Sequence, residues 1–337
     1  MRTPSRTATK IARFMLLLDS LPRLRGVLPP GAAATVEAIL RGSRAVPVRR
    51  IDAMRAPSTA RFYELTERWL GRGQLLCVGW RARSRARPTG AACRPIDASR
   101  PWCPAEGERS ARRSPAVILR RALAAGTRQL LVVGAGFDPL AVGIAAAHPG
   151  VLSVEIDAPA TAEPKRAGVE GAGLARPNHR IMAADLSRRA LAEVLAETPW
   201  RTGARSVVIA EGLLMYLAPD DVRAFFTAVR AVAGEGSRVA FSSLDADERG
   251  RPHIGALDLP IRIALRIAGE PMRWGIRPDE VPAFLAALGH RALEQPTIDA
   301  LRARCLDPLG LHEEPLLPYE HLVLSDTASH ADREQAK

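Results

Sequence analysis

The sequence predicts an α/β fold, an open and mostly parallel Rossmann-like sheet with helices on both faces and a helical extension at the N-terminus. Two observations predict it. Apolar runs of strand length alternate with helical patterns from residue 116 nearly to the end of the chain. The first of these strands runs directly into Gly134-Ala135-Gly136 and then into a helical pattern, as in nucleotide-binding units.

The expected elements follow from apolar spacing in chain order. N-terminal helices are predicted at residues 32–41, 59–70 and 117–125. Strands are predicted at residues 129–133, 151–156, 180–183, 206–210 and 237–242, each followed by a turn. The intervening and later helices are predicted at residues 141–147, 190–197, 220–233 and 278–288. Late strands at residues 292–295 and 321–325 would add an antiparallel edge.

Composition divides the 337 residues into three expected parts: a helical cap (1–80), an irregular insert (81–115) and the main domain (116–330). The insert holds nine Arg and three acidic residues, so it carries half of the formal net charge of +12. Its Arg, Pro and Ser content is typical of a solvated loop. An anion- or partner-binding arm and a replaced stretch of sequence are the alternatives.

Charge and cysteine usage exclude some classes of function. Nucleic-acid binding is disfavoured, because the charge is local and only 4% of residues are aromatic. The four cysteines, of which Cys77 and Cys305 are the first and last, have no zinc-ligand spacing, so we expect no metal. The apolar run in residues 10–18 is too short to cross a membrane. A cytoplasmic protein is expected, with a weak signal peptide as the alternative.

Glycines and acids gather where the predicted strands end. In an open parallel sheet these ends share the carboxyl edge, where ligands bind. Glycine lets a ligand approach the backbone, and an acid about 20 residues later is where nucleotide folds bind a ribose. Pro139 replaces the third glycine of a dinucleotide motif, which argues against a nicotinamide cofactor. The residues concerned are Gly134, Gly136, Glu155, Asp157, Asp185 and Glu211.

Four motifs in this order resemble the leucine carboxyl methyltransferase family and its bacterial S-adenosylmethionine-dependent relatives, some of them polyketide O-methyltransferases. They are GAGFD (134–138), VEIDAP (154–159) with Lys165 further on, AADL (183–186) and EGLLMYL (211–217). The resemblance covers residues 116–326. It implies an enzyme with the class I methyltransferase fold and S-adenosyl-L-methionine as cofactor.

The resemblance also implies a role for each site residue. Gly134 and Gly136 would approach the cofactor, and Glu155 would accept hydrogen bonds from its ribose, with Asp157 as a neighbouring acid. Asp185 would bind the adenine amine beside the apolar wall and backbone amide of Leu186, and Glu211 would line the methionine end. The acceptor would be a small molecule, such as a polyketide-like compound, methylated on a carboxylate or a hydroxyl. Only a hydroxyl would need a general base, and the sequence identifies none.

Several alternatives stay open. The family continues its glycine turn with Asp-Thr-Arg, whereas Pro139-Leu140 follows Asp138 here. Glu155 and Asp185 could be helix caps, Asp138 could cap the following helix, and Lys165 is expected on an exposed helix face. A nucleotide-dependent oxidoreductase and a degenerate methyltransferase-like binding module are the competing functions. The basic residue expected to hold the cofactor carboxylate could be Arg112, Arg113, Arg120 or Arg121.

Overall fold

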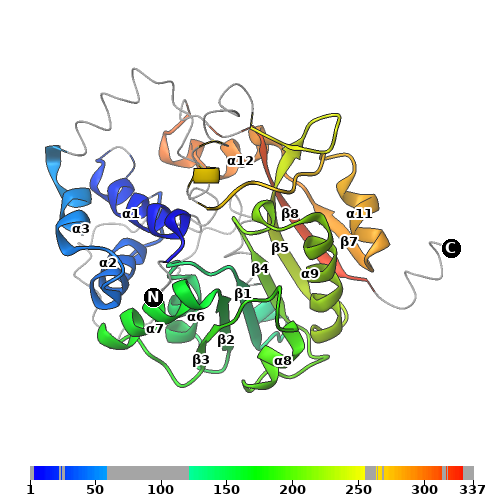
Figure 1. Ribbon diagram of the computed structural model, residues 1–337, viewed down its shortest axis with the longest axis horizontal. Helices are drawn as coiled ribbons and strands as arrows, with labels where there is room; N and C mark the ends of the chain where they lie inside the picture. Colours follow the sequence, from blue (N-terminus) through cyan, green and yellow to red (C-terminus); the bar gives the residue numbers. More distant parts are fainter. Residues whose placement is uncertain are drawn as a thin grey trace.

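A computed structural model of the chain describes residues 4–22, 24, 27–58, 121–254, 263, 265–267, 269–312, 316 and 318–328. Figure 1 shows a central twisted sheet with helices on both faces and a group of N-terminal helices at one end. The predicted fold class, a mixed α/β fold with a mostly parallel sheet, is confirmed. The expected helix at 59–70 and the insert at 81–115 lie outside the described residues.

The described helices and strands have the following bounds. The helices are α1 (Arg6–Ser20), α2 (Ala32–Ser43), α3 (Val48–Arg55), α6 (Leu140–Ala147), α7 (Pro159–Gly171), α8 (Leu191–Ala196), α9 (Pro219–Val232), α11 (Val281–Ala287) and α12 (Ile298–Cys305). Short 3-10 turns are η2 (Leu214–Tyr216) and η4 (Asp307–Leu309). The strands are β1 (Gln129–Val133), β2 (Leu152–Asp157), β3 (His179–Ala183), β4 (Val207–Ala210), β5 (Arg238–Ala246), β6 (Pro252–His253), β7 (His290–Glu294) and β8 (Glu320–Thr327).

The strand order is β3-β2-β1-β4-β5-β8-β7, with β6 paired to β5. The first five strands of this order are parallel, whereas β8 is antiparallel to both β5 and β7. The predicted antiparallel late pair is therefore confirmed. Because the order reverses at β1, the connections leaving β1 and β4 diverge, and ligands bind at such a point in open sheets.

The predicted strands agree with the observed ones to within two residues at most ends. The exception is β5, which was expected to end at residue 242 and continues to Ala246. Its last residues pair with β6 and β8 rather than with β4, which stops at the pair Ala210 and Phe241. One end of β5 therefore extends past the carboxyl edge of the sheet centre.

The three N-terminal helices pack together and onto one face of the sheet domain. Their buried apolar side chains share a core with Phe137, Val142, Ala162 and Ile181 of the main domain. The contact with α7 is close, because a Cβ at Gly168 would overlap the carbonyl oxygen of Ile39 in α2. Figure 1 shows these helices in blue beside α6 and α7. Small residues at the crossing thus join the cap to the sheet domain.

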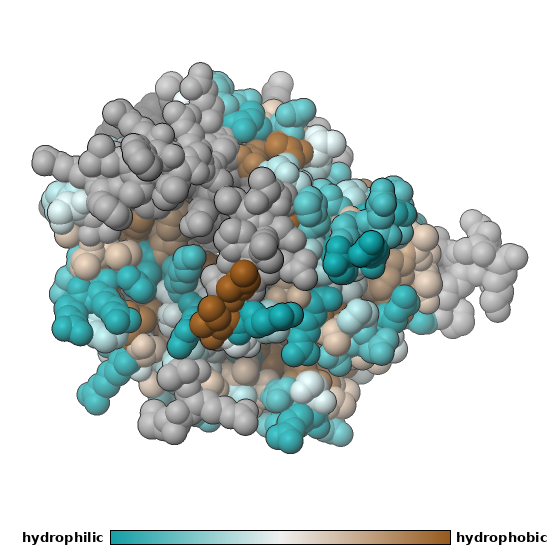
Figure 2. Space-filling model, turned by 45° about the horizontal axis from the view of Figure 1, so that its top comes forward, coloured by the Kyte–Doolittle hydropathy of each residue, from teal (hydrophilic) through white to brown (hydrophobic). Residues whose placement is uncertain are grey.

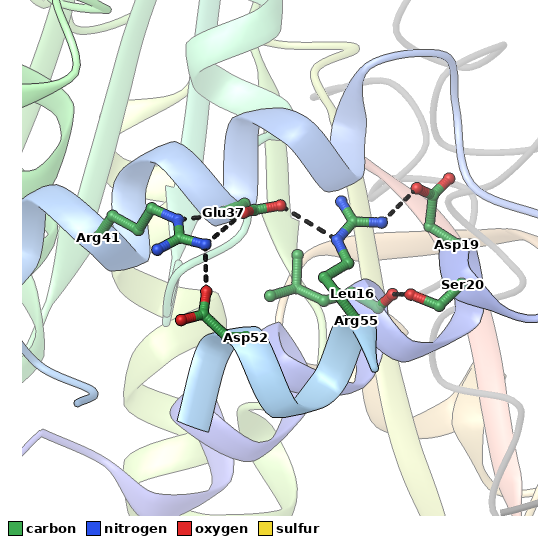
Figure 3. A network of polar contacts seen from close by, with 7 residues as sticks. All are labelled: Leu16, Asp19, Ser20, Glu37, Arg41, Asp52 and Arg55. Carbon is green, nitrogen blue, oxygen red and sulfur yellow. Dashed lines mark hydrogen bonds and ion pairs between the residues drawn. The ribbon is translucent and has the colours of Figure 1, made fainter. Parts of the chain in front are cut away.

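Partly exposed ion pairs connect the three cap helices to one another (Figure 3). Arg55 on α3 donates to Asp19 of α1 at 2.6 Å and to Glu37 of α2 at 3.1 Å. Arg41 on α2 also bonds Glu37, at 2.9 Å, and reaches Asp52 of α3. We call these five residues the cap network.

The bounds of two long helices in the described residues were not predicted. The apolar run in residues 10–18, which was interpreted as too short to cross a membrane, lies in α1. This helix buries Leu16, Leu17 and Leu18 in the cap core. A helix was expected at Lys165, but the bounds of α7 were not predicted, because Pro159, Pro164 and the glycines of this segment have low helix propensity. Pro159 fits since it stands at the start of the helix, where its missing N–H is not needed.

Polar residues predominate among the described residues visible on one face of the molecule. Figure 2 shows predominantly hydrophilic colouring on one face, with small apolar areas between. Among the described residues, no helix is long and apolar enough to cross a membrane. Within the same part of the chain, no group of three or more His, Cys, Asp or Glu side chains could hold a metal ion. The large apolar side chains that stay exposed are Ile11, Val48, Ile263, Ile267 and Leu293.

Candidate functional site

The glycine turn after β1 has the backbone geometry that requires glycine. Gly134 and Gly136 have φ values of 70° and 49°, which side chains with a Cβ rarely adopt. The N–H of Gly134 donates to the carbonyl of Ile156 at 2.9 Å, so the turn begins in register with β2. Asp138 accepts from the N–H of Leu140, the first residue of α6, at 2.8 Å, although the N-cap residue itself is Pro139. The turn is therefore fixed at its start and at its end.

Asp157, the last residue of β2, holds the middle of the glycine turn. One carboxylate oxygen accepts from the N–H of Gly136 at 2.7 Å, and the other accepts from the N–H of Ala158 at 2.7 Å. Burial raises the pKa of Asp157, although these two N–H groups and the nearby Lys165 act in the opposite direction. The side chain is only partly buried and lies at the carboxyl edge. A carboxylate accepts about four hydrogen bonds, so a ligand can bond the same group.

Asp185 and Leu186 follow β3, and a backbone hydrogen bond holds this segment beside Asp157. The N–H of Ala184 donates to the carbonyl of Asp157 at 2.9 Å. The carboxylate of Asp185 accepts from the N–H and hydroxyl of Ser187 at 3.1 and 2.6 Å, an Asx turn rather than a cap of a long helix. Leu186 is partly buried against the sheet core. Both residues therefore occupy the same edge as Asp157.

Glu211 continues the edge on the other side of β1. It follows β4 directly and is partly buried. The next residue, Gly212, donates its N–H to the hydroxyl of Ser242 in β5 at 2.9 Å. The side chain of Leu213 lies within 2.9 Å of the position that a Cβ on Gly134 would take. The loop after β4 and the glycine turn are therefore in contact.

The structure thus brings Gly134, Gly136, Asp157, Asp185 and Glu211 to one edge, over the ends of four adjacent strands. Strands in a sheet lie about 4.8 Å apart, so β3 and β4 are separated by about 14 Å across β2 and β1. This arrangement suits an elongated ligand that runs across the strand ends.

Glu155 lies elsewhere, in the interior beneath the glycine turn. Its side chain is 2% exposed, and its two oxygens contact Lys165 of α7 and, at 2.8 Å, Nε2 of His179 in β3. Glu155 and Asp157 point to the same face of β2 because they are two residues apart, but only Asp157 reaches the rim. The expected contact of Glu155 with a ribose is therefore not supported by this geometry, which favours Asp157.

Two opposing influences set the pKa of Glu155. Burial raises it by disfavouring the charged form, whereas the ammonium of Lys165 and the hydrogen bond with His179 lower it. The net direction is downward, so Glu155 is ionised near neutral pH. A fully buried carboxylate thus remains charged because its partners compensate for lost hydration.

Lys165 corrects a prediction. It was expected on an exposed helix face, but its side chain is 1% exposed. Its ammonium donates to the carbonyls of Asp138 at 2.8 Å and Ala135 at 3.4 Å, both in the glycine turn. The helical spacing could have indicated this burial. Lys165 stands four residues after Thr161 and four before Val169, and both of these neighbours are buried on the same stripe of α7.

The start of α1 covers the glycine turn. A Cβ on Gly136 would lie 3.3 Å from the side chain of Ala8, and the N–H of Ser5 donates to Thr161 of α7 at 3.1 Å. Glu270, in the segment after β5, accepts from the N–H groups of Arg6 and Thr7 at 2.9 and 3.0 Å. This contact was not predicted.

The candidates Arg112, Arg113 and Arg120 for the cofactor carboxylate lie outside the described residues, and Arg121 is exposed.

A second polar pair lies where β5 extends past β4. Nε2 of His321 is 3.9 Å from Oδ2 of Asp245, which is longer than a hydrogen bond. That nitrogen is buried and has no hydrogen-bond partner among the described residues. Burial lowers the pKa of His321, against the influence of Asp245, so the ring is neutral near pH 7. His321 and Ser243 are paired across β8 and β5, two residues beyond the end of β4.

A comparison with known families gives an independent view of this edge. Residues 113–230 match the model of the family described as leucine carboxyl methyltransferase. The expected family resemblance is confirmed. The matched segment contains β1 to β4 and every residue expected at the site, from Gly134 to Glu211.

Several bacterial proteins are similar to the chain. A Mycolicibacterium gilvum protein named "Putative S-adenosyl-L-methionine-dependent methyltransferase" is 29% identical over 209 residues, which are 57% of this chain and 64% of that protein. A protein of the same name from Mycobacterium bovis is 37% identical over 123 residues, covering 36% of this chain and 40% of its own length. The chain thus spans about two thirds or less of these relatives. Their names agree with the enzyme class and cofactor expected from the sequence.

Solved structures of methyltransferases are also similar. The mitomycin 7-O-methyltransferase MmcR has a TM-score of 0.41 and 16% identity, covering 90% of this chain and 75% of its own. An O-methyltransferase family protein from Burkholderia thailandensis has a TM-score of 0.42 and 13% identity, covering 64% of this chain and 58% of its own.

Proposed function

We propose that the chain is an S-adenosyl-L-methionine-dependent O-methyltransferase acting on a small molecule. The observation that carries the proposal is the edge where Asp157 holds the glycine turn between Asp185 and Glu211. The cofactor has a sulfonium, an ammonium, ribose hydroxyls and an adenine amine, all of which bind well to carboxylates. The confirmed family resemblance supports the same assignment.

Each residue of the edge has a role in this proposal. Asp157 accepts hydrogen bonds from the ribose hydroxyls, a role that we give to it rather than to Glu155 because it is only partly buried and lies at the carboxyl edge. Asp185 accepts from the adenine amine, and Leu186 provides an apolar wall and a backbone amide. Glu211 lines the methionine end, and Gly134 and Gly136 allow the backbone to approach. When bound, the cofactor would supply an activated methyl group, which passes from its sulfur to the acceptor oxygen and leaves S-adenosylhomocysteine.

Alignment is the main contribution that such residues make to methyl transfer. Holding acceptor and donor in line contributes up to about 7 to 11 kcal/mol in well-oriented reactions. A carboxylate acceptor is already ionised at neutral pH and needs no base. For a hydroxyl acceptor we assign the base to His321. Its ring is neutral, and its Nε2, which has no hydrogen-bond partner in the described part of the chain, lies at the extended end of β5 beside Asp245.

Transfer of a labelled methyl group tests the function. Wild-type protein is incubated with S-adenosylmethionine labelled on its methyl group and with separate panels of aromatic carboxylic acids and phenols. We expect labelled product with wild type, at least about tenfold less with Asp157→Ala, and no change with Asp52→Ala on the exposed face of α3. Equal activity of the Asp157 and Asp52 variants would contradict the assignment of the ribose site.

The same assay distinguishes the two acceptor chemistries. If the acceptor is a hydroxyl, His321→Gln lowers the methylation rate but leaves binding of S-adenosylhomocysteine unchanged, and the wild-type rate rises with pH as His321 loses its proton. If the product is a methyl ester, the variant retains the wild-type rate. Retention of full activity on a phenol by His321→Gln would exclude His321 as the base.

A further inference from the structure

The ammonium of Lys165 contacts three acceptors of the described residues beneath the glycine turn. An ammonium has three N–H donors. Its described acceptors are the carboxylate of Glu155 and the carbonyls of Asp138 and Ala135, the latter two at 2.8 and 3.4 Å. Two of these three acceptors therefore belong to the turn itself, and the third neutralises the charge.

The other oxygen of Glu155 connects this unit to the sheet. It lies 2.8 Å from Nε2 of His179, at the start of β3. The three side chains are at most 3% exposed, and they join α7, β2 and β3 to the turn. We call Glu155, Lys165 and His179 the buried triad.

A gain in stability alone does not explain why the protein has the buried triad. Removing two charges from water is costly, and replacement of a buried ion pair by neutral residues of similar volume is often neutral or stabilising. The directional contacts of Lys165 with two carbonyls are what a neutral replacement would lose. Asp157 holds the same turn from the rim, through the N–H of Gly136. The turn is thus bonded from below by its carbonyls and from the rim by an N–H group.

We propose that Lys165, held by Glu155 and His179, is a positioning residue that sets the conformation of the glycine turn for cofactor binding. The proposal rests on the proposed function, because it assumes that the turn receives S-adenosylmethionine. Lys165 is buried and does not contact the ligand. It acts through the carbonyls of Ala135 and Asp138, since displacement of a site by about 1 Å can reduce rates or binding severely.

A neutral double variant separates positioning from folding. Glu155→Gln/Lys165→Met removes both charges at nearly constant volume and keeps a polar partner for His179. The matched control is Asp326→Asn, which disturbs another buried carboxylate, 3% exposed and bonded to Arg238 at 2.8 Å and Arg291 at 2.9 Å. Asp326 lies at the opposite edge of the sheet, where β5 begins.

Two measurements are made on each protein at a temperature where circular dichroism shows it folded. Calorimetric titration gives the Kd for S-adenosylhomocysteine, and hydrogen exchange reports on the amides of residues 134–140. For the double variant we expect a Kd at least about tenfold higher than that of wild type and faster exchange in the turn. For Asp326→Asn we expect a Kd within about twofold of wild type and unchanged exchange in the turn. Wild-type affinity and wild-type exchange in the double variant would overturn the proposal.

The two readouts separate this proposal from the proposed function. If wild type itself does not bind S-adenosylhomocysteine, the proposed function fails, while faster exchange in the double variant alone would still support Lys165 as the residue that fixes the turn. Unchanged exchange would then overturn both. If the double variant does not fold, Lys165→Gln replaces it, with weaker binding and faster exchange expected and wild-type values on both counts as the contradicting result.

Discussion

The buried triad and the cap network use the same kinds of charged groups in opposite surroundings. In the buried triad, Glu155 and Lys165 are at most 2% exposed, and their contacts fix a backbone turn. In the cap network, the side chains of Arg41, Asp52 and Arg55 are 29 to 55% exposed (Figure 3). Water screens the second set but not the first. The comparison indicates that the contribution of an ion pair to stability depends more on its burial than on the distance between its charged atoms.

The largest expected effect is on the buried triad. Glu155→Ala leaves the ammonium of Lys165 in the interior without its carboxylate, and breaking a buried pair in this way costs about 3 to 5 kcal/mol. Urea unfolding followed by circular dichroism measures the change in the free energy of unfolding. A loss below about 1 kcal/mol would place Glu155 with the exposed pairs of the cap network.

The second prediction concerns how the stabilising contribution of Glu155 in the buried triad changes with pH. The pKa of Glu155 is lower in the folded protein than its ordinary value of 4.5, so its stabilising contribution is complete above that value and is lost as the pH falls through the folded pKa. We expect the difference in stability between wild type and Glu155→Gln to shrink below pH 4.5. Unfolding curves at a series of pH values test this. A difference that is constant down to pH 2 would contradict the ionised state of Glu155 in the fold.

A third prediction asks whether packing or the cap network holds the cap to the sheet domain. Gly168→Ala adds a Cβ that overlaps the carbonyl oxygen of Ile39, and a Cβ added at Gly42 on α2 would lie 2.8 Å from the carbonyl oxygen of Gly168. Overpacking of this kind costs about 1 to 3 kcal/mol. Gly143→Ala on α6 is the control, since a Cβ there meets nothing within 4 Å. Equal unfolding midpoints for the two variants would show that the helix crossing is less tight than described.

The smallest expected effect is on the cap network. Arg55→Ala removes contacts with Asp19 and Glu37, and exposed pairs of this kind contribute about 0 to 1 kcal/mol. We also expect the loss to decrease in 1 M salt, where the Debye length is about 3 Å. Denaturant unfolding at low and high salt measures both quantities. A salt-independent loss above about 2 kcal/mol would mean that this network behaves like the buried triad.

Much of the sheet and of its edge could be predicted from the sequence. The bounds of β1 were predicted to the residue, because an apolar run ends at an obligatory glycine turn. Glycines and acids at successive strand ends were expected on one edge since parallel strands share a direction, and Asp157, Asp185 and Glu211 lie there. Local pattern and topology are sufficient for that part.

The depth of each side chain could not be predicted from the pattern. Glu155 and Asp157 share a face of β2, and only the packing of α7 determines that the first is buried and the second is at the rim. Lys165 was misplaced because a lysine suggests solvent, whereas here its charge is compensated by residues far apart in sequence. Helix α1 was missed because its apolar run was judged for length and not for the core that it joins.

The position of the ribose tests the account most directly. A crystal structure of the chain with S-adenosylhomocysteine is predicted to place the ribose hydroxyls within hydrogen-bond distance of Asp157, with Glu155 still bonded to Lys165 and His179 beneath the turn. A ribose bound to Glu155, or a ligand bound away from the glycine turn and Asp157, would contradict it.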